Sequence, residues 1–394
     1  MSMVAAVVSA VERAPLPDAV TRAGIAFLVG RAARRLRRED ATAEARFAAD
    51  MAAWPIAVHA ADANTQHYEV PAAFFAHVLG PRRKYSCCLY DGADSLAEAE
   101  EQALAETASH AQLADGQRIL ELGCGWGSLT LWMARRYPRA QIVAVSNSNS
   151  QRLHIMAEAA RLGVANVQVV TADMNAFALA EQFECVAPVG RIDGDIPVGR
   201  IDGDIPAGRF DRVTPTARSD HVAAVGHFDK VAPTARFDRI VSVEMFEHMA
   251  NWPALLRRIH GWLAPDGRLF LHVFSHRATP YRFDHADKAD WIATHFFTGG
   301  IMPSHGLLRH VAHPFEIEAD WRWSGEHYRR TADDWLANFD RNTPAIEAIL
   351  AKVYGADATL WKRRWRLFFL ATAGLFGANR GEEWGVSHYR LRPA

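Results

Sequence analysis

The sequence predicts an α/β protein built around a mostly parallel β-sheet. Short runs rich in β-branched residues alternate with helical stretches from about residue 115 onward, as in a chain of βαβ units. A glycine-rich turn follows the first run, and two acidic residues follow the fourth. The expected strands are RILEL (118–122), QIVAVS (141–146), VQVV (167–170), RIVSV (239–243), RLFLHVF (268–274) and VSHYRL (386–391). Further helices are expected near 331–353 and 358–376.

The composition excludes several classes of protein. A formal net charge of −1 argues against a general nucleic-acid binder, which would be markedly basic. The apolar run at the N-terminus has no basic segment before it, so we predict no signal peptide. The four cysteines form no CxxC pair and favour a reducing, cytoplasmic setting. The histidines lack the spacing of a zinc site, so we predict no metal.

The N-terminal region, residues 1–80, is alanine-rich and expected to be helical, with the α/β domain spanning 81–394. Residues 21–38 carry six arginines beside an apolar patch that includes Ile25 and Phe27. Such a helix can lie on an anionic membrane, here the inner face, or it can pack on its own domain. Both interpretations stay open, as does a homodimer.

Residues 181–243 divide into seven consecutive nonamers, two of them nearly identical. We interpret about 184–237 as a tandem duplication inserted before the fourth strand. Proline and glycine in most copies oppose a regular sheet, so we expect a mostly disordered surface loop, with a binding arm as the alternative. Only the last copy leads into EMFEHM, so it should form the strand.

The glycine-rich turn after RILEL predicts a ligand site. Gly123, Gly125 and Gly127 follow G-x-G-x-G spacing, and Glu121 lies just before them. Glycines let the backbone turn sharply and approach a ligand at the start of the next helix. A dinucleotide site would prefer G-x-G-x-x-G. The glutamate disfavours phosphate and suits a cationic ligand with an amino group, such as S-adenosylmethionine (SAM).

The ends of the next two strands supply the other expected contacts to this ligand. The acidic residue that often follows the second strand is missing, so Ser146, Asn147 or Gln151 must hydrogen-bond the ribose. After the third strand, Asp173 can accept a hydrogen bond from the adenine amino group, and Met174 can pack on the ring. Asp173 could instead cap the N-terminus of a helix.

At this point a family is recognisable from six landmarks. They are YSCCLY (85–90), ELGCGWGS (121–128), VEMFEHM (243–249), HFFTGGIMPS (295–304), SGEHY (324–328) and GEEWGVSHY (381–389). The chain resembles the SAM-dependent methyltransferases that group cyclopropane-fatty-acyl-phospholipid synthases with coclaurine-type N-methyltransferases, from residue 68 to the C-terminus without the repeats. The resemblance implies a Rossmann-like, seven-stranded class I methyltransferase sheet. It also implies cofactor contacts at Tyr85 and Ser86.

This family contains two chemistries. Lipid-modifying members typically have glycine at the position of Glu244 and proline at that of Thr298, whereas the N-methyltransferases read EMFEHM, FFT-x-G and GEEW-x-x-SH, as this chain does. Cyclopropane-forming members hold a bicarbonate ion as base. Its matching positions are Cys87, Glu247, His272 and Tyr328, with Phe274 where isoleucine is usual. The first hypothesis is therefore N-methylation of a small aromatic or cyclic amine. The alternative is methylation or cyclopropanation of phospholipid acyl chains.

Glu244 and His248 are the expected catalytic pair for an amine. An aliphatic amine with a pKa of about 10.4 is only about one part in 10³ neutral at pH 7, so a base near the methyl group would help. If the turn after the strand is helical, these two side chains share one face at i,i+4 and Glu247 points elsewhere. In the alternative interpretation, Glu247 and His248 merely cap the helix and hydrogen-bond the sheet.

Aromatic side chains from the C-terminal half are expected to complete the pocket. Aromatic walls suit a ring-bearing amine through cation–π attraction, and they would equally suit an acyl chain. The expected wall residues are Phe296, Phe297, Trp321, Trp323, Tyr328 and Trp384. Aromatics at helical spacing, namely Trp361, Trp365 and Phe368, are expected in the core.

Overall fold

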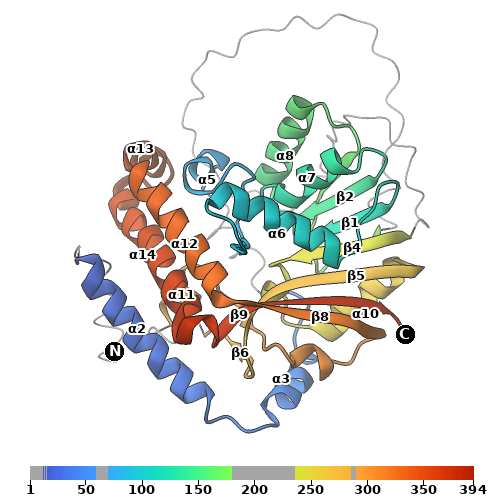
Figure 1. The fold of residues 1–394 in the computed structure, drawn as a ribbon, viewed down its shortest axis with the longest axis horizontal. Helices are drawn as coiled ribbons and strands as arrows, with labels where there is room; N and C mark the ends of the chain where they lie inside the picture. Colours follow the sequence, from blue (N-terminus) through green and yellow to red (C-terminus); the bar gives the residue numbers. More distant parts are fainter. Residues whose placement is uncertain (1–11, 13, 15, 59–69, 180–235, 285–289) are drawn as a thin grey trace, which may run out of the picture.

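A seven-stranded sheet with the strand order β3-β2-β1-β4-β5-β9-β8 forms the centre of the computed structural model (Figure 1). The structure describes residues 12, 14, 16–58, 70–179, 236–284 and 290–394. Its strands are β1 (Arg118–Leu122), β2 (Gln141–Ser146), β3 (Val167–Thr171), β4 (Phe237–Val243), β5 (Leu263–His276), β8 (Phe315–Ser324) and β9 (Trp384–Pro393). Strands β1 to β5 pair in parallel, and β9 lies antiparallel between β5 and β8. A separate short ribbon pairs β6 (Tyr281–Arg282) with β7 (Ile301–Met302).

Helices surround this sheet in three groups (Figure 1). One face is covered by α6 (Leu96–His110), α7 (Ser128–Arg136) and α8 (Asn149–Leu162), and the other by α3 (Ala43–Met51) and α10 (Trp252–Trp262). A helical layer beside the sheet contains α2 (Asp18–Leu36), α5 (Ala72–Val78), α12 (Gly325–Arg341), α13 (Thr343–Tyr354) and α14 (Ala358–Phe376). The remaining elements are α11 (Trp291–His295), η1 (Phe246–His248), η2 (Leu307–Arg309), η3 (Gly355–Asp357) and η4 (Ala378–Gly381).

The central strands are apolar on both faces because both faces are covered. In β1, Ile119 packs toward α6 and α7, while Leu120 packs toward α10. In β4 next to it, Val241 and Ile240 divide in the same way. Successive side chains of a strand alternate between its faces, and a parallel sheet covered by helices buries both. This is why these strands read as near-continuous apolar runs in the sequence.

Two expectations about the C-terminal half were wrong. The single helix expected near 331–353 is two helices, α12 and α13, with Asn342 between them. Pro344 lies in the first turn of α13, where its missing N–H costs nothing, and it could not continue α12. Strand β8 was not expected, although Phe315 to Trp323 alternates apolar and charged residues, the pattern of a strand with one covered face.

The expectation about the repeats is confirmed at the one place where it can be checked. Strand β4 is formed by the last nonamer copy, and Phe237, its first residue, is buried against α10 and β5. Residues 180–235, which hold the other copies, lie outside the described residues. The expectation that they form a disordered loop therefore stays a prediction. The division into 1–80 and 81–394 stays a prediction.

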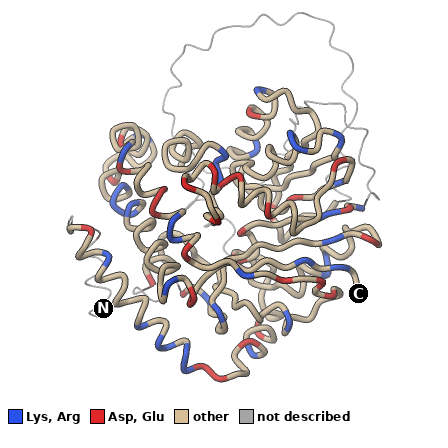
Figure 2. The backbone as a smooth tube through the Cα atoms, in the orientation of Figure 1, with Lys and Arg blue, Asp and Glu red and all other residues tan. Residues whose placement is uncertain are grey.

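The arginine-rich helix α2 packs on its own chain (Figure 2). Ile25 contacts Gly374 in α14, and Arg22 pairs with Asp333 in α12 at 2.9 Å. Arg37, just after the helix, pairs with the buried carboxylate of Glu383 at 2.6 Å. These contacts agree with the second interpretation of this helix, whereas membrane contact stays a prediction. Among the helices that the structure describes, none is long and apolar enough to cross a membrane.

Candidate functional site

The glycine-rich turn between β1 and α7 uses its three glycines in two ways. All three have positive φ angles, +82° at Gly123, +50° at Gly125 and +82° at Gly127. A Cβ atom on Gly123 would lie 2.6 Å from Cβ of Met245, and one on Gly127 would lie 2.7 Å from Cγ1 of Ile155. A Cβ on Gly125 would meet nothing within 4 Å. The outer glycines therefore allow close packing, and the middle one faces open space at the pocket.

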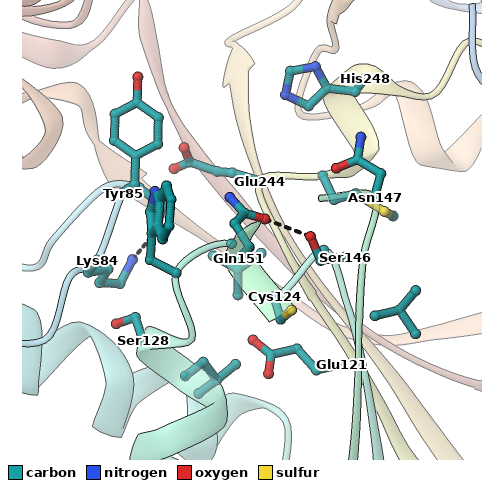
Figure 3. A pocket seen from close by; sticks show the side chains of 18 of the residues that line it. Lys84, Tyr85, Glu121, Cys124, Ser128, Ser146, Asn147, Gln151, Glu244 and His248 are labelled. Carbon is teal, nitrogen blue, oxygen red and sulfur yellow. Dashed lines mark hydrogen bonds between the residues drawn. The ribbon is translucent and has the colours of Figure 1, made fainter. Parts of the chain in front are cut away.

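The pocket lies where the carboxyl ends of the parallel strands meet. Leu122 at the end of β1 pairs with Val145 of β2 on one side and Ser242 of β4 on the other, so the following turns converge. All the expected cofactor residues except Gly127 line this pocket. They are Tyr85, Ser86, Glu121, Gly123, Gly125, Ser146, Asn147, Gln151, Asp173 and Met174. Figure 3 shows Glu121 toward one end of the view and His248 toward the other, with Glu244 between them.

Glu121 is a buried carboxylate without a protein cation. Its side chain accepts a hydrogen bond from Oγ1 of Thr130 at 2.5 Å, and no ion pair reaches it from the residues that the structure describes. Burial raises its pKa to about 8, against the smaller lowering effect of Thr130. A cationic group that pairs with such a buried carboxyl stabilises its ionised form, because the attraction offsets the cost of burying the charge. The position therefore fits an ammonium group.

Gln151, in the first turn of α8, offers a hydrogen-bond donor to the pocket beside the end of β2. Ser146 donates from its hydroxyl to Oε1 of Gln151 at 2.6 Å (Figure 3). The amide nitrogen Nε2 of Gln151 is buried and has no hydrogen-bond partner among the described residues. Buried polar atoms in native proteins are nearly always paired. This donor, in a residue that lines the pocket, therefore fits an oxygen-bearing ligand such as a ribose.

Asp173 lines the pocket beside Met174, and no helix begins directly after it in the described residues. Its side chain accepts a hydrogen bond from the backbone N–H of Asn175 at 2.8 Å and so fixes a turn, while its contact to adenine stays a prediction. Sequence reasoning missed Trp126 and Ser128, whose buried side-chain polar atoms also line the pocket without a partner among the described residues. Their place within GCGWGS was the available signal.

The loop before α6 contributes a pocket residue that the sequence did not predict, Lys84, beside the expected Tyr85, Ser86 and Cys87. Lys84 is 3% exposed and lines the pocket. Its ammonium donates to Oγ of Ser86 and to the carbonyl oxygen of Cys87, both at 2.6 Å. Buried Glu100 in α6 fixes the loop, because it accepts from the backbone N–H groups of Arg82 at 2.7 Å and Lys84 at 3.1 Å. No sequence motif marks Lys84 as buried.

Glu244 does not stand on a helix, so the i,i+4 argument for pairing it with His248 was wrong. Its φ angle is +48°, in the left-handed region, and the helical turn η1 begins only at Phe246. A residue other than glycine in this region carries strain and must be held by its surroundings. Here its backbone N–H donates to the carbonyl of His272 in β5 at 2.8 Å. The turn nevertheless directs both Glu244 and His248 into the pocket.

The carboxylate of Glu244 contacts three of the other expected catalytic residues. Oε1 accepts from the backbone N–H of Cys87 at 2.9 Å and lies 3.2 Å from Nε2 of His272. Oε2 accepts from the hydroxyl of Tyr328 at 2.7 Å. Tyr328 also lines the pocket, whereas Cys87 and His272 reach it through Glu244. Burial raises the pKa of Glu244, opposed by the nearby ammonium of Lys84 and by these hydrogen bonds.

His248 and Glu247 have different surroundings. The imidazole of His248 stacks on Phe297, with centroids 4.8 Å apart, and burial lowers its pKa to about 4 despite the nearby Glu244. It is therefore neutral at pH 7. Glu247 is fully buried and does not line the pocket. Its Oε1 accepts from the backbone N–H of Phe274 in β5 at 2.6 Å, which is the sheet contact of the alternative interpretation.

The aromatic wall differs from the expected one. Of the expected residues, Phe297 and Tyr328 line the pocket, whereas the others belong to the core, to the sheet or to a stack with His110. Phe274, Trp335 and Phe368 complete the wall instead. Phe368 was expected in the core. It belongs to the core of the helical layer and also lines the pocket. Helical spacing cannot distinguish these two surroundings.

Comparison with known proteins identifies the family. The family model described as mycolic acid cyclopropane synthetase matches residues 57–195 and 211–382, well over half of the chain. The chain belongs to this family. The gap in the match falls within the nonamer repeats, as expected for an insertion.

Relatives in this family include members of both chemistries. The chain is 29% identical over 339 residues to (S)-coclaurine N-methyltransferase of Thalictrum flavum subsp. glaucum, covering 84% of this chain and 79% of that protein. It is 24% identical to cyclopropane-fatty-acyl-phospholipid synthase of Escherichia coli (strain K12), covering 82% of this chain and 66% of that protein. A crystal structure of coclaurine N-methyltransferase bound to N-methylheliamine and SAH superposes with a TM-score of 0.79 at 28% identity, over 99% of this chain and 100% of that one.

Within the mycolic acid cyclopropane synthetase family, this chain is a SAM-dependent methyltransferase with the Rossmann-like class I sheet that the sequence predicted. The pocket residues fit SAM as the methyl donor. Glu121 offers a carboxyl without a cationic partner among the described residues for the ammonium, and Gln151 in the first turn of α8 offers an amide donor. The carboxyl end of such a sheet is also where ligands of open α/β folds bind.

Proposed function

We propose that this methyltransferase N-methylates a small aromatic or cyclic amine. The carboxylate of Glu244 carries the proposal, because it faces the pocket while the N–H of Cys87, the ring of His272 and the hydroxyl of Tyr328 hold it. A carboxylate has about four lone-pair sites. The N–H of Cys87 and the hydroxyl of Tyr328 fill two of them, and the ring of His272 lies beside a third. The remaining site is available to accept a proton from a substrate nitrogen.

The reaction requires an amine nitrogen with a free lone pair, and SAM supplies the methyl group. At pH 7 only about one in 10³ molecules of an aliphatic amine is neutral, so the bound ammonium must lose a proton. Burial raises the pKa of Glu244, which makes it a better proton acceptor than an ordinary carboxylate. Neutral His248, fixed by its stack on Phe297, is suited to orienting the amine rather than to accepting the proton.

The lipid alternative requires a bicarbonate ion, and the residues present do not fit one. Three of the positions implied for that ion, Cys87, His272 and Tyr328, are hydrogen-bonded to Glu244. The fourth, Glu247, binds the backbone of Phe274. Glycine in place of Glu244 would leave Cys87, His272 and Tyr328 without this carboxylate. In this chain the base is therefore a side chain of the protein, the Glu244 carboxylate, which we call the tethered base. We derive no step through bicarbonate.

The aromatic wall supports an amine that carries a ring. Phe274, Phe297 and Phe368 line the pocket with Trp335 and Tyr328. Phe297 stacks on His248 and contacts Phe274, and Tyr328 bonds to Glu244, so at least these three rings lie beside the proposed base. Aromatic faces attract a cation held within about 6 Å and stack on other rings. A cyclic amine would therefore be held by its ring while its nitrogen reaches Glu244.

Methyl transfer from radiolabelled SAM tests this function. One reaction would contain a panel of tetrahydroisoquinolines and aryl-alkyl amines, and the other vesicles of phospholipid with unsaturated acyl chains. We expect label in the amines, at the nitrogen. Label only in the lipid would overturn the proposal and restore the alternative.

A further inference from the structure

A continuous row of side chains connects Glu244 to the protein surface. Nε2 of His272 lies 3.2 Å from the Glu244 carboxylate, and Nδ1 of His272 lies 2.8 Å from Nε2 of His388. Nδ1 of His388 lies 2.9 Å from Nδ1 of His110, and Nε2 of His110 lies 2.9 Å from Oε1 of Glu106. Each imidazole thus uses both ring nitrogens, one toward the pocket and one toward the surface.

The fold places these residues side by side and keeps water away from them. His272 and His388 face each other in the antiparallel pairing of β5 with β9, and His110 is the last residue of α6, which covers this face. Trp321 stacks on His110 at 3.7 Å between centroids, and Trp323 lies 4.3 Å from His388.

Exposure increases along the row toward Glu106. His272 and His388 are fully buried, and His110 is 8% exposed. The side chain of Glu106 is 41% exposed and can exchange protons with solvent. The row therefore has one end in the pocket and the other at the surface.

Counting protons shows that this row can hold one more proton than its neutral imidazoles supply. Burial is the largest cause that lowers the pKa of His272, His388 and His110, and Lys84 lowers it further at the first two. At His110, Glu106 raises the pKa and Arg390 lowers it, but the net direction is still downward, so all three rings are neutral at pH 7. Three neutral imidazoles bring three N–H protons to four contacts. The fourth contact becomes a hydrogen bond only when one terminal carboxyl carries a proton.

We propose that His272, His388, His110 and Glu106 form the exit path for the proton that Glu244 takes from the amine. The inference rests on the proposed function. Glu244 donates its proton to Nε2 of His272, whose Nδ1–H passes to Nε2 of His388. The Nδ1–H of His388 passes to His110, and the Nε2–H of His110 passes to Glu106. One proton has then left the pocket, and every ring is neutral again.

The path is needed when both substrates fill the pocket and Glu244 has no water to receive its proton. Burial disfavours a charged imidazole at each of the three rings, and Lys84 adds to this at His272 and His388, so the proton shifts in all contacts are coupled. Between turnovers the pocket is open to water. A proton entering at Glu106 then returns the rings to their starting tautomers, and Glu244 releases the displaced proton to water.

His388→Gln tests the path, because an amide can contact both neighbours but cannot pass a proton between them. The variant would be compared with wild type on two acceptors, a strongly basic secondary amine and a weakly basic N-alkylaniline that is already neutral at pH 7. We expect kcat for the basic amine to fall at least about tenfold, within the usual contribution of proton transfer, and kcat for the aniline to stay within about twofold. The deficit should narrow as pH rises and more of the basic amine is neutral.

Glu106→Gln removes the carboxylate at the surface end of the path. It should lower kcat for the basic amine less strongly than His388→Gln does. Glu101→Gln is its matched control, since Glu101 is a comparably exposed carboxylate on the same helix that pairs with Arg82. Equal losses of kcat for both acceptors in His388→Gln would show a structural role and overturn the path, as would a wild-type rate for the basic amine. A wild-type enzyme that methylates neither amine would instead overturn the proposed function.

Discussion

The pocket has two halves that the chain builds in different ways. The donor half, which would hold the methyl donor SAM, takes its residues from the ends of parallel strands, the turns after them and the first turn of α8. These residues are Glu121, Gly125, Ser146, Gln151 and Asp173. The acceptor half, which would hold the amine, is formed by Glu244, His248 and Tyr328, with Cys87 and His272 behind Glu244. It takes these residues from a loop, a strained turn, a strand and a helix far apart in the sequence.

This difference separates what is general from what is specific in the enzyme. Parallel strands with covered faces bring their carboxyl ends to one edge whatever the substrate, so the donor half follows from the sheet. The acceptor half depends on a single carboxylate and on the partners that hold it. We therefore expect changes in the acceptor half to affect turnover and changes in the donor half to affect SAM binding.

The largest difference between the effect on turnover and the effect on SAM binding is expected from Glu244→Gln. Turnover should fall by about 10²–10⁴, the usual contribution of a general base, while the Kd for SAM stays unchanged. Rates from labelled SAM and binding by calorimetry would check this. Glu383→Gln is the matched control, because Glu383 is a buried carboxylate outside the pocket that pairs with Arg37. A wild-type rate in Glu244→Gln would refute the tethered base.

A second pair of variants sharpens the same point. Glu244→Gly removes the whole side chain and exposes the three groups that contact it, namely the N–H of Cys87, the ring of His272 and the hydroxyl of Tyr328. Added bicarbonate should therefore restore part of the lost rate. Bicarbonate should not help Glu244→Gln, because the amide still occupies the space. Equal responses of the two variants to bicarbonate would contradict the tethered-carboxylate interpretation.

In the donor half, Gly125→Val should weaken SAM binding by about tenfold or more. Valine at a positive φ angle costs about 1–2 kcal/mol of strain, and its side chain would enter the open space beside the pocket. Gly163→Val is the matched control, since Gly163 also has a positive φ angle and open space but ends α8 away from the pocket. Equal SAM affinities in the two variants would show that strain alone explains the effect.

A smaller effect is expected from pH through Glu121. Its pKa of about 8 leaves it mostly protonated at pH 7, and an ammonium favours the ionised form. SAM binding should therefore release protons, and affinity should rise from pH 6 to 7.5 by up to about tenfold per pH unit, while an α-amino group stays mostly charged. Calorimetry in buffers of different ionisation enthalpy would count the protons. Glu121→Gln should abolish the release, and unchanged release would assign it to another group.

The smallest effect on activity is expected from deleting residues 184–237. Phe183 would then occupy the buried position of Phe237 at the start of β4, so both halves should keep their geometry. Shortening the connection about sixfold should stabilise the fold by about 1–2 kcal/mol of loop-closure entropy. Thermal unfolding and kcat would be measured together. Failure to fold would show that the repeats are structural.

The sequence determined the donor half because its signals are local. An apolar run ends in Glu121, three glycines follow, and a helix begins, all within one segment that has one favourable conformation. Local signals also predicted β1, β2 and α14 with the bounds that the structure shows. Strand β8 was missed although its alternation of apolar and charged residues is itself a local signal of a strand with one covered face.

Only the tertiary structure decided how the acceptor half works. The sequence placed Glu244 beside His248 on a helix, whereas the left-handed turn at Glu244 is stable because β5, Cys87 and Tyr328 hold it from other parts of the chain. Lys84 and the row from His272 to Glu106 are likewise products of long-range packing, with His272 and His388 brought together by strand pairing. Local sequence patterns encode conformations of neighbouring residues. They do not encode which distant polar groups will share one buried site, because that depends on the complete arrangement of the sheet and its helices.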